Sequence, residues 1–354
     1  MTPNILIVGA GPTGLTAAVE LARRGIIADV VEKHDAPSQF SRAVGILPES
    51  MDLLEPSGVA AKIRAHAMMP KQAVFHHGGK PLGRIALDRF EAPNAHLFAL
   101  AQDRTELFLR EAFEAYGGSV AYETAFESFT QSDDQVTATI GGDVRTYDYL
   151  IGADGISSTV RRQAGIAYPG IDLPDEWSIA DVDVDDWPHM DAFCAYILPK
   201  GEAMIVVPLE PDRVRVVVSD PDALSRVPVA MNVTRVRRSG SFYISVRQAE
   251  HYQAGRVFLA GDAAHCHSPV GGRGMNLGIA DAADLAARFA EGGLEDYHSV
   301  RHAAGQSILE LSENGRNALM STNPVTRAAV RMAFRAVGRL SFLQDRVVKG
   351  ILNL

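Results

Sequence analysis

Cysteine and tryptophan are scarce in this chain, which has two residues of each among 354. Cys194 and Cys266 lie far apart, and neither belongs to a C-x-x-C motif. Two isolated cysteines do not make the disulfide framework of a small secreted protein. We therefore interpret both residues as reduced thiols of a cytoplasmic protein.

Long apolar runs and an excess of basic charge are also missing. No stretch reaches the roughly 18 apolar residues of a membrane-spanning helix, and the first residues lack the basic start and apolar stretch of a signal peptide. Acidic residues outnumber basic ones by 43 to 34, which gives a net charge of -9. A nucleic-acid-binding protein usually has the opposite balance. We expect a monomer or homodimer that has no transmembrane segment and does not bind nucleic acid.

The beginning of the chain has the pattern of a strand–helix–strand unit. Ile5–Val8 is a short apolar run that predicts a buried strand. The following residues place apolar side chains on one helical face and end at Gly25, after which 27–31 predicts a second strand. Further along, the sequence predicts a helix over 102–116 and a β-hairpin over 136–146.

The turn between the first strand and the first helix, residues 9–14, reads Gly-Ala-Gly-Pro-Thr-Gly. In this G-x-G-x-x-G pattern the first glycine permits a tight turn, the second admits a pyrophosphate, and the third lets helix and strand pack closely. The helix N-terminus adds partial positive charge toward the phosphates. Glu32 ends the second strand, where a carboxylate accepts hydrogen bonds from ribose hydroxyls, and Lys33 follows it. The unit predicts dinucleotide binding but does not separate FAD from NAD.

Two features late in the chain favour a flavin. Asp262 closes the strand predicted over 255–261, and a carboxylate there can bind a ribityl hydroxyl, which FAD has and NAD lacks. The glycine-rich segment 269–276 follows, and its backbone can approach a flat ring closely. The next helix points its first N–H groups, near Met275 and Asn276, at that ring. Such a helix N-terminus stabilises negative charge on the N1/O2 edge of a reduced flavin.

Together with Asp154-Gly155 in the middle of the chain, these segments resemble those of the FAD-dependent aromatic hydroxylases. These are the group A flavoprotein monooxygenases, which have the p-hydroxybenzoate hydroxylase fold, and the resemblance extends over most of the chain. The segments that carry it are Ser41-Arg42-Ala43, the Q-x-x-T-E-x-x-L helix that starts at Gln102, 149–161, 261–281, and Tyr297 with Arg301. Arg273 stands where many relatives carry glutamine.

The resemblance implies an α/β fold class, with a Rossmann-type FAD-binding domain, an inserted antiparallel-sheet substrate domain and C-terminal helices. Short apolar runs joined by tight turns after about residue 170 agree with an inserted sheet. The FAD-binding domain is expected over 1–72, 98–170 and 253–300, the substrate domain over 73–97 and 171–252, and the C-terminal helical segment over 301–354.

The resemblance also implies a reaction. NADPH or NADH reduces the FAD, O2 adds to give a flavin C4a-hydroperoxide, and the distal oxygen passes to an aromatic or polyketide-like substrate. The single G-x-G-x-x-G fits this family, in which the nicotinamide cofactor has no Rossmann domain of its own. The predicted catalytic residues are Arg42, Pro269 and His265. The predicted FAD-binding residues are Gly9, Gly11, Pro12, Thr13, Gly14, Glu32, Lys33, Arg42, Gln102, Asp154, Asp262, Pro269, Gly272, Gly274, Met275 and Asn276.

Several residues keep two interpretations. His265 either orients the substrate or hydrogen-bonds structurally within the FAD-binding domain. Tyr196, on an inserted strand, either pairs with a phenol or belongs to the core. His76-His77 has no partners at metal-ligand spacing, so we predict no metal site.

The C-terminal segment and the activity also keep alternatives. Arg327, Arg331, Arg335 and Arg339 recur every four residues opposite an apolar face, as in an amphipathic helix. That helix either docks on the body of the protein or binds a membrane surface or an anionic partner. The rival functions are a flavin-dependent reductase or dehydrogenase for a quinone or prenyl substrate, and a flavin-binding protein without turnover.

Overall fold

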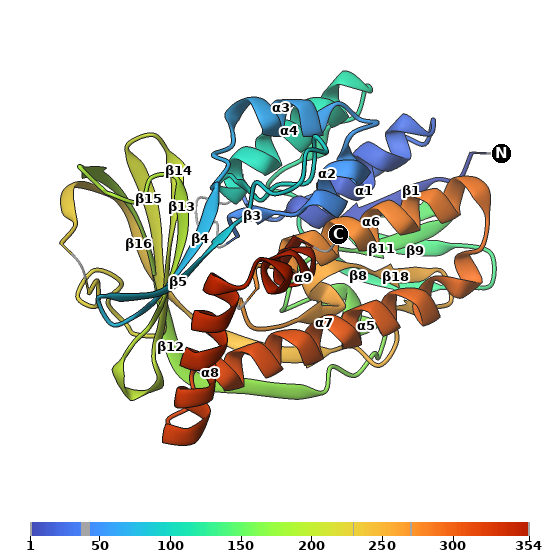
Figure 1. Ribbon diagram of the computed structural model, residues 1–354. Helices are drawn as coiled ribbons and strands as arrows, with labels where there is room; N and C mark the ends of the chain where they lie inside the picture. Colours follow the sequence, from blue (N-terminus) through green and yellow to red (C-terminus); the bar gives the residue numbers. More distant parts are fainter. Residues whose placement is uncertain (1, 37–42, 229, 270, 353–354) are drawn as a thin grey trace.

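The computed structural model describes residues 2–36, 43–228, 230–269 and 271–352. Figure 1 shows a large β-sheet at one side of the molecule, a second sheet covered by helices at the other, and the C-terminal helices lying across both. Arg42, predicted both to bind FAD and to act in catalysis, lies outside the described residues.

A six-stranded sheet forms the half that contains both the first turn and the middle motif. Its strands, in spatial order, are β17 (Gln253–Ala254), β18 (Val257–Leu259), β11 (Tyr149–Gly152), β1 (Ile5–Val8), β2 (Asp29–Val31) and β7 (Val120–Ala121). All neighbours are parallel except β17 and β18. Every residue of β1 is buried, as expected of a strand covered on both faces. The predicted strand–helix–strand unit is confirmed, although β2 begins at Asp29 because Ile27 is exposed to solvent.

Helices cover this sheet and bring distant parts of the chain together. Those on this half are α1 (Pro12–Arg23), α2 (Pro48–Leu54), α3 (Val59–His66), α4 (Gln102–Ala115), α5 (Thr159–Gln163) and α6 (Gly274–Glu291). Helices α1 and α6 pack against each other through their buried faces, which include Ala18, Leu21 and Ala282. This contact sets the late glycine segment beside the first one.

The predicted β-hairpin is confirmed and belongs to a smaller three-stranded sheet. Its strands are β8 (Phe126–Gln131), β9 (Val136–Ile140) and β10 (Asp143–Tyr147), and all are antiparallel. A separate two-stranded pair consists of β3 (Gly45–Ile46) and β6 (Phe98–Ala99).

The inserted sheet has eight strands and is larger than the sequence indicates. In spatial order they are β19 (His265–Cys266), β16 (Asn232–Gln248), β12 (Gly170–Asp185), β15 (Arg213–Val218), β14 (Ala203–Glu210), β13 (Ala192–Ile197), β4 (Gln72–His77) and β5 (Lys80–Ala86). The predicted antiparallel pairing holds for every neighbouring pair except β13 and β4, which are parallel. β12 and β16 also run much longer than their apolar cores predict, because charged residues continue both strands. The domain boundaries given above stay a prediction.

The two faces of this sheet pack against different partners. On β13, Phe193, Ala195 and Ile197 face the rest of the molecule, whereas Cys194 and Tyr196 point to the opposite side. The opposite side has its own core, in which Tyr196 packs with Trp187 and neighbouring valines. The inner face is therefore available to line a site between the two sheets.

Three helices complete the chain: α7 (Tyr297–Leu319), α8 (Pro324–Arg339) and α9 (Ser341–Leu352). In Figure 1, α7 runs from the six-stranded sheet toward the eight-stranded one, and α8 turns to lie against β5. The ring of Phe334 on α8 stacks on Phe75 of β4 with centroids 4.2 Å apart. The predicted amphipathic helix is thus docked on the sheet, with Phe334 in the contact.

Acidification is expected to destabilise the protein through His76. Its ring is 3% exposed and stacks on Tyr196 at 4.4 Å. Burial, together with the nearby charges of His189 and Arg84, lowers the pKa of His76 to about 4 from 6.5. The folded state therefore binds fewer protons than the unfolded state, and stability is lost as pH falls from about 6.5 toward 4, by up to about 3 kcal/mol. Denaturant unfolding between pH 7.5 and 4.5 measures this loss.

The matched variant for this test is His76→Phe, which keeps a ring in the stack but cannot be protonated. We expect its stability to fall less steeply with decreasing pH than that of the wild type. An identical pH dependence in the two proteins would show that other groups cause the loss.

Candidate active site

The first glycine turn leaves β1 at Gly9 and enters α1 at Pro12. A methyl group on Gly9, whose φ is +106°, would overlap the carbonyl oxygen of Ala153, and one on Gly14 would overlap the carbonyl oxygen of Gly9. Gly11 differs, because nothing lies within 4 Å of a Cβ built there. Two of the glycines therefore allow close packing, and the third leaves open space at the N-terminus of α1, where a phosphate group fits.

Glu32 lies beside this turn, at the end of β2. One carboxylate oxygen accepts the N–H of Ala10 at 3.0 Å, and the other accepts the N–H of His34 at 3.1 Å. The carboxylate thus fixes the turn at the place where a ribose is expected. The neighbouring Lys33 side chain is exposed.

Thr13 has a packing role that the sequence did not indicate. A Cβ added to Gly261 or to Gly278 would overlap the Thr13 hydroxyl oxygen. The Thr13 side chain therefore fills the contact between α1, α6 and the Asp262 segment. The predicted contact between Thr13 and FAD stays a prediction beside this packing role.

Asp154 holds the middle motif in shape. Its carboxylate accepts the Ser158 hydroxyl at 2.5 Å, the Thr159 N–H at 2.6 Å and the Val160 N–H at 3.2 Å. The two N–H groups are unsatisfied donors at the start of α5, which an acidic side chain commonly caps. The predicted contact between Asp154 and FAD stays a prediction.

Arg161 connects the middle motif with the late one. Its guanidinium group donates to the carbonyl of Ala263 at 2.8 Å and to that of Ile156 at 2.7 Å, and it lies 3.7 Å from the ring centroid of Tyr168. The Tyr168 hydroxyl in turn donates to the carbonyl of Asp262 at 2.9 Å. Asp262 itself lies in a short 3-10 helix, Gly261–Ala263, directly after β18. These contacts explain how two segments about 100 residues apart in the chain share one site.

His265 belongs to a buried ionic cluster behind this segment. Its Nε2 lies 2.5 Å from a carboxylate oxygen of Asp281, which also accepts the Gly261 N–H at 3.0 Å, while Arg301 contacts the other oxygen at 2.7 Å. His265 is 1% exposed and Asp281 is fully buried. Burial alone would raise the pKa of Asp281, but the contacts with His265 and Arg301 hold it below its ordinary value. This environment agrees with the structural interpretation of His265 and offers no contact with a substrate.

The late glycine segment precedes α6. Gly271 and Gly272 have φ values of +93° and +62°, and both line a cavity with Pro269. Helix α6 begins at Gly274, so its first N–H groups lie next to this turn, as the sequence predicts. The buried Arg273 donates to the carbonyl of Gly350 at 2.5 Å, which ties α9 to the same segment.

Asn276 fastens the late segment to β3. Its side-chain oxygen accepts the Leu47 N–H at 2.8 Å, and its amide nitrogen donates to the carbonyls of Gly45 and Gly272 at 3.0 Å and 2.9 Å. These hydrogen bonds fix the walls around the expected ring site, and the predicted contact between Asn276 and FAD stays a prediction. Met275 packs against the core of the FAD-binding half.

Asn276→Ala is expected to lower the free energy of unfolding by about 2 kcal/mol, because it leaves a buried N–H and two carbonyls without their partner. Urea unfolding measures this change. Asn94→Ala is the control, since Asn94 bonds to the side chains of Asp52 and Arg64 near the surface, and a change below about 0.5 kcal/mol is expected there. Equal effects of the two substitutions would contradict the role given to Asn276.

Gln102 begins α4 and holds the segment that follows Arg42. Its side-chain oxygen accepts the Ala43 N–H at 3.3 Å, and its nitrogen donates to Glu106 at 2.8 Å. Burial raises the pKa of Glu106 to about 7, so this carboxyl is partly protonated near neutral pH. Gln102 thereby lies at the predicted place, next to the flavin-contacting segment.

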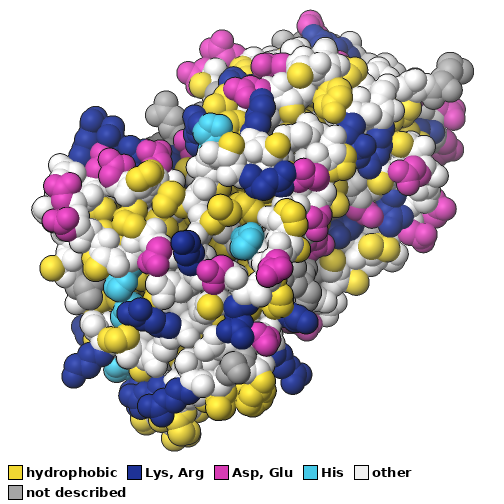
Figure 2. Space-filling view, turned by 45° about the horizontal axis from the view of Figure 1, so that its top comes forward, with side chains coloured by type: hydrophobic (Ala, Val, Ile, Leu, Met, Phe, Trp, Pro, Cys, Tyr) yellow, Lys and Arg dark blue, Asp and Glu magenta, His cyan; other side chains and the backbone are white. Residues whose placement is uncertain are grey.

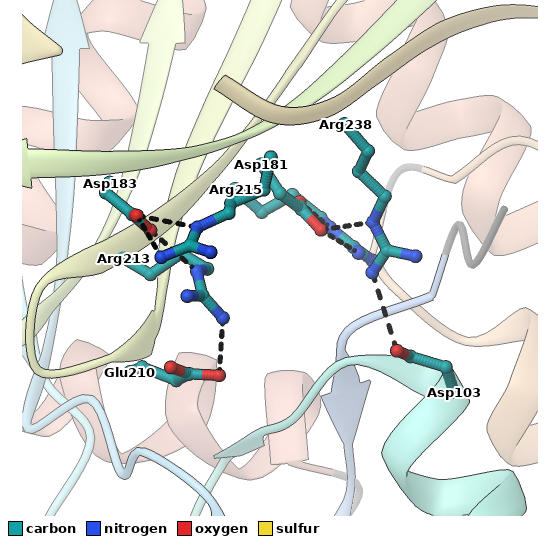
Figure 3. A network of polar contacts seen from close by, with 8 residues as sticks. Asp103, Asp181, Asp183, Glu210, Arg213, Arg215 and Arg238 are labelled. Carbon is teal, nitrogen blue, oxygen red and sulfur yellow. Dashed lines mark hydrogen bonds and ion pairs between the residues drawn. The ribbon is translucent and has the colours of Figure 1, made fainter. Parts of the chain in front are cut away.

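An arginine–aspartate network on the inner face of the eight-stranded sheet reaches the same segment (Figure 3). Arg215, which has no exposed surface, contacts both carboxylate oxygens of Asp181 at 2.7 Å and 2.8 Å. Arg238 contacts Asp181 at 2.5 Å and Asp103 of α4 at 3.4 Å. A second nitrogen of Arg215 donates to the carbonyl of Ala43 at 2.9 Å. The network therefore connects the substrate sheet to both α4 and the segment after Arg42.

Sequence reasoning missed this network. The signal was present as Asp-x-Asp at 181 and 183 and Arg-x-Arg at 213 and 215, an alternation that sets like charges on one face of a strand. The two pairs face each other because Asp181 lies opposite Arg215, and Asp183 opposite Arg213. Figure 3 shows this second pair beside the first.

A cavity of about 250 Å³ lies between this sheet and the late glycine segment. Its lining is apolar almost throughout and includes no Asp, Glu, Lys, Arg or His among the described residues. Pro269, Gly271 and Gly272 form one wall, and Phe75, Phe193 and Ala195 are part of another. An apolar cavity of this kind is where a small apolar ligand commonly binds.

Tyr196 does not offer its hydroxyl to this cavity. The strand alternation turns the ring to the opposite face, where it stacks on His76. Of its two interpretations the structure therefore favours the core.

Comparison with known proteins agrees with this geometry. A protein-family model described as an FAD binding domain matches residues 2–228 and 223–312. Rifampicin monooxygenase of Streptomyces venezuelae is 31% identical over 356 residues, which cover 93% of this chain and 74% of the relative. The chain belongs to the FAD-dependent aromatic hydroxylases. Membership of this family supports FAD as the cofactor and confirms the fold class that the motifs implied.

Two further relatives show the range of this family. Dialkyldecalin synthase of Streptomyces rugosporus is 35% identical over 333 residues, covering 86% of this chain and 70% of the relative. The solved ternary complex of aklavinone-11 hydroxylase with FAD and aklavinone has a TM-score of 0.76 at 28% identity, covering 89% of this chain and 68% of that one. Among the described residues, no helix combines the length and the apolar character needed to cross a membrane.

Proposed function

We propose that this protein is an NAD(P)H- and O2-consuming monooxygenase that hydroxylates an apolar aromatic or polyketide-like molecule. The observation that carries the proposal is the apolar cavity of about 250 Å³ against the glycine turn at 271–272. Together with the open space over Gly11, it provides separate places for a ring, a pyrophosphate and a substrate.

The residues present fit FAD. Gly11 and the N-terminus of α1 would hold the pyrophosphate, and Glu32 lies where a ribose would follow. The turn at 271–272 has no side chains to obstruct a flat ring, and the N-terminus of α6 would stabilise negative charge on it. When bound, FAD would supply the redox and oxygen chemistry of the reaction.

The chain's own residues exclude water and hold the substrate. The cavity is lined by aliphatic and aromatic side chains, which remove the water that would otherwise discharge an activated oxygen as peroxide. Among the described lining residues there is no Asp, Glu, Lys, Arg or His, and the Tyr196 ring stacks on His76 at the opposite face of the sheet. This favours an aromatic substrate that is electron-rich without deprotonation by the protein.

The volume limits the substrate further. A protein cavity of about 150 Å³ holds one benzene ring. The cavity of about 250 Å³ therefore suits a fused system of two or three rings more than a single phenol. The nicotinamide cofactor would meet the flavin from outside this space, and we propose either NADH or NADPH as the reductant.

The test is substrate-dependent oxidation of NADH or NADPH by the FAD-loaded protein, with ¹⁸O2 as the oxygen source and a panel of naphthols, indoles and small polycyclic phenols. We expect one labelled oxygen atom in the product. Ala195→Phe fills the cavity without approaching Gly11, so it should keep the bound-flavin spectrum and lose the substrate response. Oxidation of NAD(P)H that yields only peroxide across the whole panel would count against a hydroxylase and favour the reductase alternative.

A second candidate activity rests on a specific observation. The relative named dialkyldecalin synthase is 35% identical, and an apolar cavity without acid or base groups also suits a cyclisation that needs only shape. Such a reaction uses neither NAD(P)H nor O2. Product formed from a linear polyene in their absence would therefore identify a cyclase, and its dependence on both would identify a monooxygenase.

A further inference from the structure

Positive charge gathers on the tip of the β4–β5 hairpin, far along the chain from the glycine motifs. Arg327 and Arg331 of α8 each place a guanidinium nitrogen 3.4 Å from Nε2 of His77. Arg335 lies one helical turn further, and Lys80 is paired with His77 across the hairpin. We call Arg327, Arg331, Arg335 and His77 the α8 cationic cluster.

This cluster lacks the counter-charge that other arginines have. Arg213, Arg238, Arg288 and Arg316 each pair with a carboxylate within 3.4 Å. Within the part of the chain that the structure describes, no carboxylate forms an ion pair with an arginine of the α8 cationic cluster. Figure 2 shows Lys and Arg side chains at the lower end of the molecule, where α8 lies in Figure 1. Such an arrangement is unusual in a chain with a net charge of -9.

The positive charge of the α8 cationic cluster affects the pKa of His77, whose imidazole lies at its centre. Burial, and then the neighbouring Arg331, Arg327 and Arg335, lower the pKa of His77 below its ordinary value. A neutral imidazole nitrogen is the only acceptor that the two nearest guanidinium groups share there among the described side chains. The imidazole nitrogen, together with the Leu198 carbonyl that accepts from Arg327 at 3.3 Å, occupies few of the donors of these two half-buried cations and leaves the others to solvent or to a ligand.

We propose that the α8 cationic cluster is a binding site for a phosphate-class oxyanion. Two guanidinium groups that converge on one point offer several N–H donors to one tetrahedral anion, the geometry in which arginine binds phosphate most strongly. The bound group would replace the imidazole as the shared acceptor. This site is separate from the flavin site, and its existence does not depend on the proposed hydroxylation.

The site is connected to the substrate cavity through α8. Phe334, between Arg331 and Arg335 in the sequence, stacks on Phe75, which lines the cavity. Arg327 also lies 3.3 Å from the carbonyl of Leu198, next to the end of β13. An anion bound here would therefore hold α8 against the strands that form the cavity wall.

Calorimetric titration of the FAD-loaded protein with inorganic phosphate tests the proposal, with chloride used to keep the ionic strength constant. We expect saturable one-site binding that becomes at least about tenfold weaker in Arg331→Gln. Arg346→Gln is the matched control, because it removes the same charge from an exposed position on α9, and it should bind as the wild type does. Far-ultraviolet circular dichroism of both variants checks that α8 remains folded.

A second measurement distinguishes a defined site from general charge attraction. The NMR titration of His77 should show a higher imidazole pKa in saturating phosphate, because the anion offsets the nearby arginines. No binding at 20 mM phosphate, or equal affinity in the wild type and both variants, would overturn the proposal.

The phosphate could come from free phosphate esters or from the 2′-phosphate of NADPH, and a further arm separates these sources. If NADPH supplies it, NADPH binds more tightly than NADH, inorganic phosphate competes with NADPH, and Arg331→Gln abolishes the difference. If NADPH and NADH bind equally while phosphate still binds, the occupant is another phosphate ester.

Discussion

Asp181→Ala is expected to destabilise the protein by about 3 to 5 kcal/mol, which is the usual effect of removing one partner from a buried ion pair. Arg215 has no exposed surface, and Asp181 is 3% exposed. Burial opposes ionisation of Asp181, but the contacts with Arg215 and Arg238 still bring its pKa below the ordinary value. The substitution removes the Asp181 carboxylate from a guanidinium group that has no exposed surface.

Guanidinium chloride unfolding at pH 7.5 measures this effect, and Asp172→Ala provides the control. Asp172 also contacts an arginine through two oxygens, at 3.1 Å and 2.8 Å from Arg247, but this pair lies at the surface. We expect only a small change there, because solvent screens the exposed pair. If the two substitutions have equal effects, the burial of the Asp181 pair contributes nothing to stability.

The same substitution should also weaken FAD binding, which tests the connection between the two halves. Arg215 donates to the carbonyl of Ala43, and Gln102 accepts the N–H of the same residue. Without Asp181 the Arg215 side chain loses its orientation, so the segment after Arg42 is held on one side only. Asp181→Leu combined with Arg215→Met should recover part of the stability, because it removes the buried charge, but it should not recover FAD affinity.

The elements around the cofactor were predictable because their signals are local. A buried strand followed by a glycine turn and an amphipathic helix is visible within about 25 residues, and β1 and α1 lie where this pattern places them. The late turn and the start of α6 at Gly274 follow from the same kind of signal. Each depends on backbone geometry that only a few residue types can adopt.

The protein contacts of single polar side chains were harder to predict. Thr13, Asp154 and Asn276 are predicted to contact FAD, and the sequence did not indicate that all three also contact protein groups that tie the site together. A polar residue in a binding motif can serve the ligand or the backbone around it. Spacing along the chain does not distinguish these two uses. The backbone donors that such a side chain satisfies come from other segments, and only the tertiary fold brings those segments next to it.

The arrangement of the inserted sheet could not be read from the sequence for a different reason. The Asp181 and Arg215 contact depends on the register of β12 against β15. A shift of one residue would turn either side chain to the opposite face, and no local signal sets this register. The same holds for the cavity, since its walls come from β4, β13, β14 and the segment at 269–272.

Gly11→Ala and Gly14→Ala, two substitutions of the same kind three residues apart, are expected to fail in opposite ways. A methyl group on Gly14 would overlap the carbonyl oxygen of Gly9 and approach the Cβ of Ala153 at 3.4 Å. Both neighbours belong to the packed βαβ core, so Gly14→Ala should unfold the FAD-binding half or abolish soluble expression. A methyl group on Gly11 meets no protein atom within 4 Å, so the apoprotein should keep its stability.

The loss in Gly11→Ala should instead appear in FAD binding. Its methyl group would occupy the space over the N-terminus of α1, where the pyrophosphate approaches the backbone. We expect affinity for FAD to fall about 100-fold, equivalent to about 2.7 kcal/mol. Thermal unfolding of the apoprotein and fluorescence titration with FAD separate stability from binding. Gly350→Ala is the control, because Gly350 lies in α9 and also has nothing within 4 Å of a built Cβ, so neither quantity should fall.

The pair of measurements decides where the pyrophosphate lies, because each substitution isolates one function of the turn. If the Gly11→Ala apoprotein is stable but binds FAD weakly, the FAD phosphates lie over Gly11. The packing of α1 then depends on Gly9 and Gly14. Wild-type affinity for FAD in a folded Gly11→Ala protein would mean that the phosphates do not approach the N-terminus of α1. In that case the open space over Gly11 has another purpose. The first glycine motif would then no longer support placing the flavin ring at the turn formed by residues 271–272.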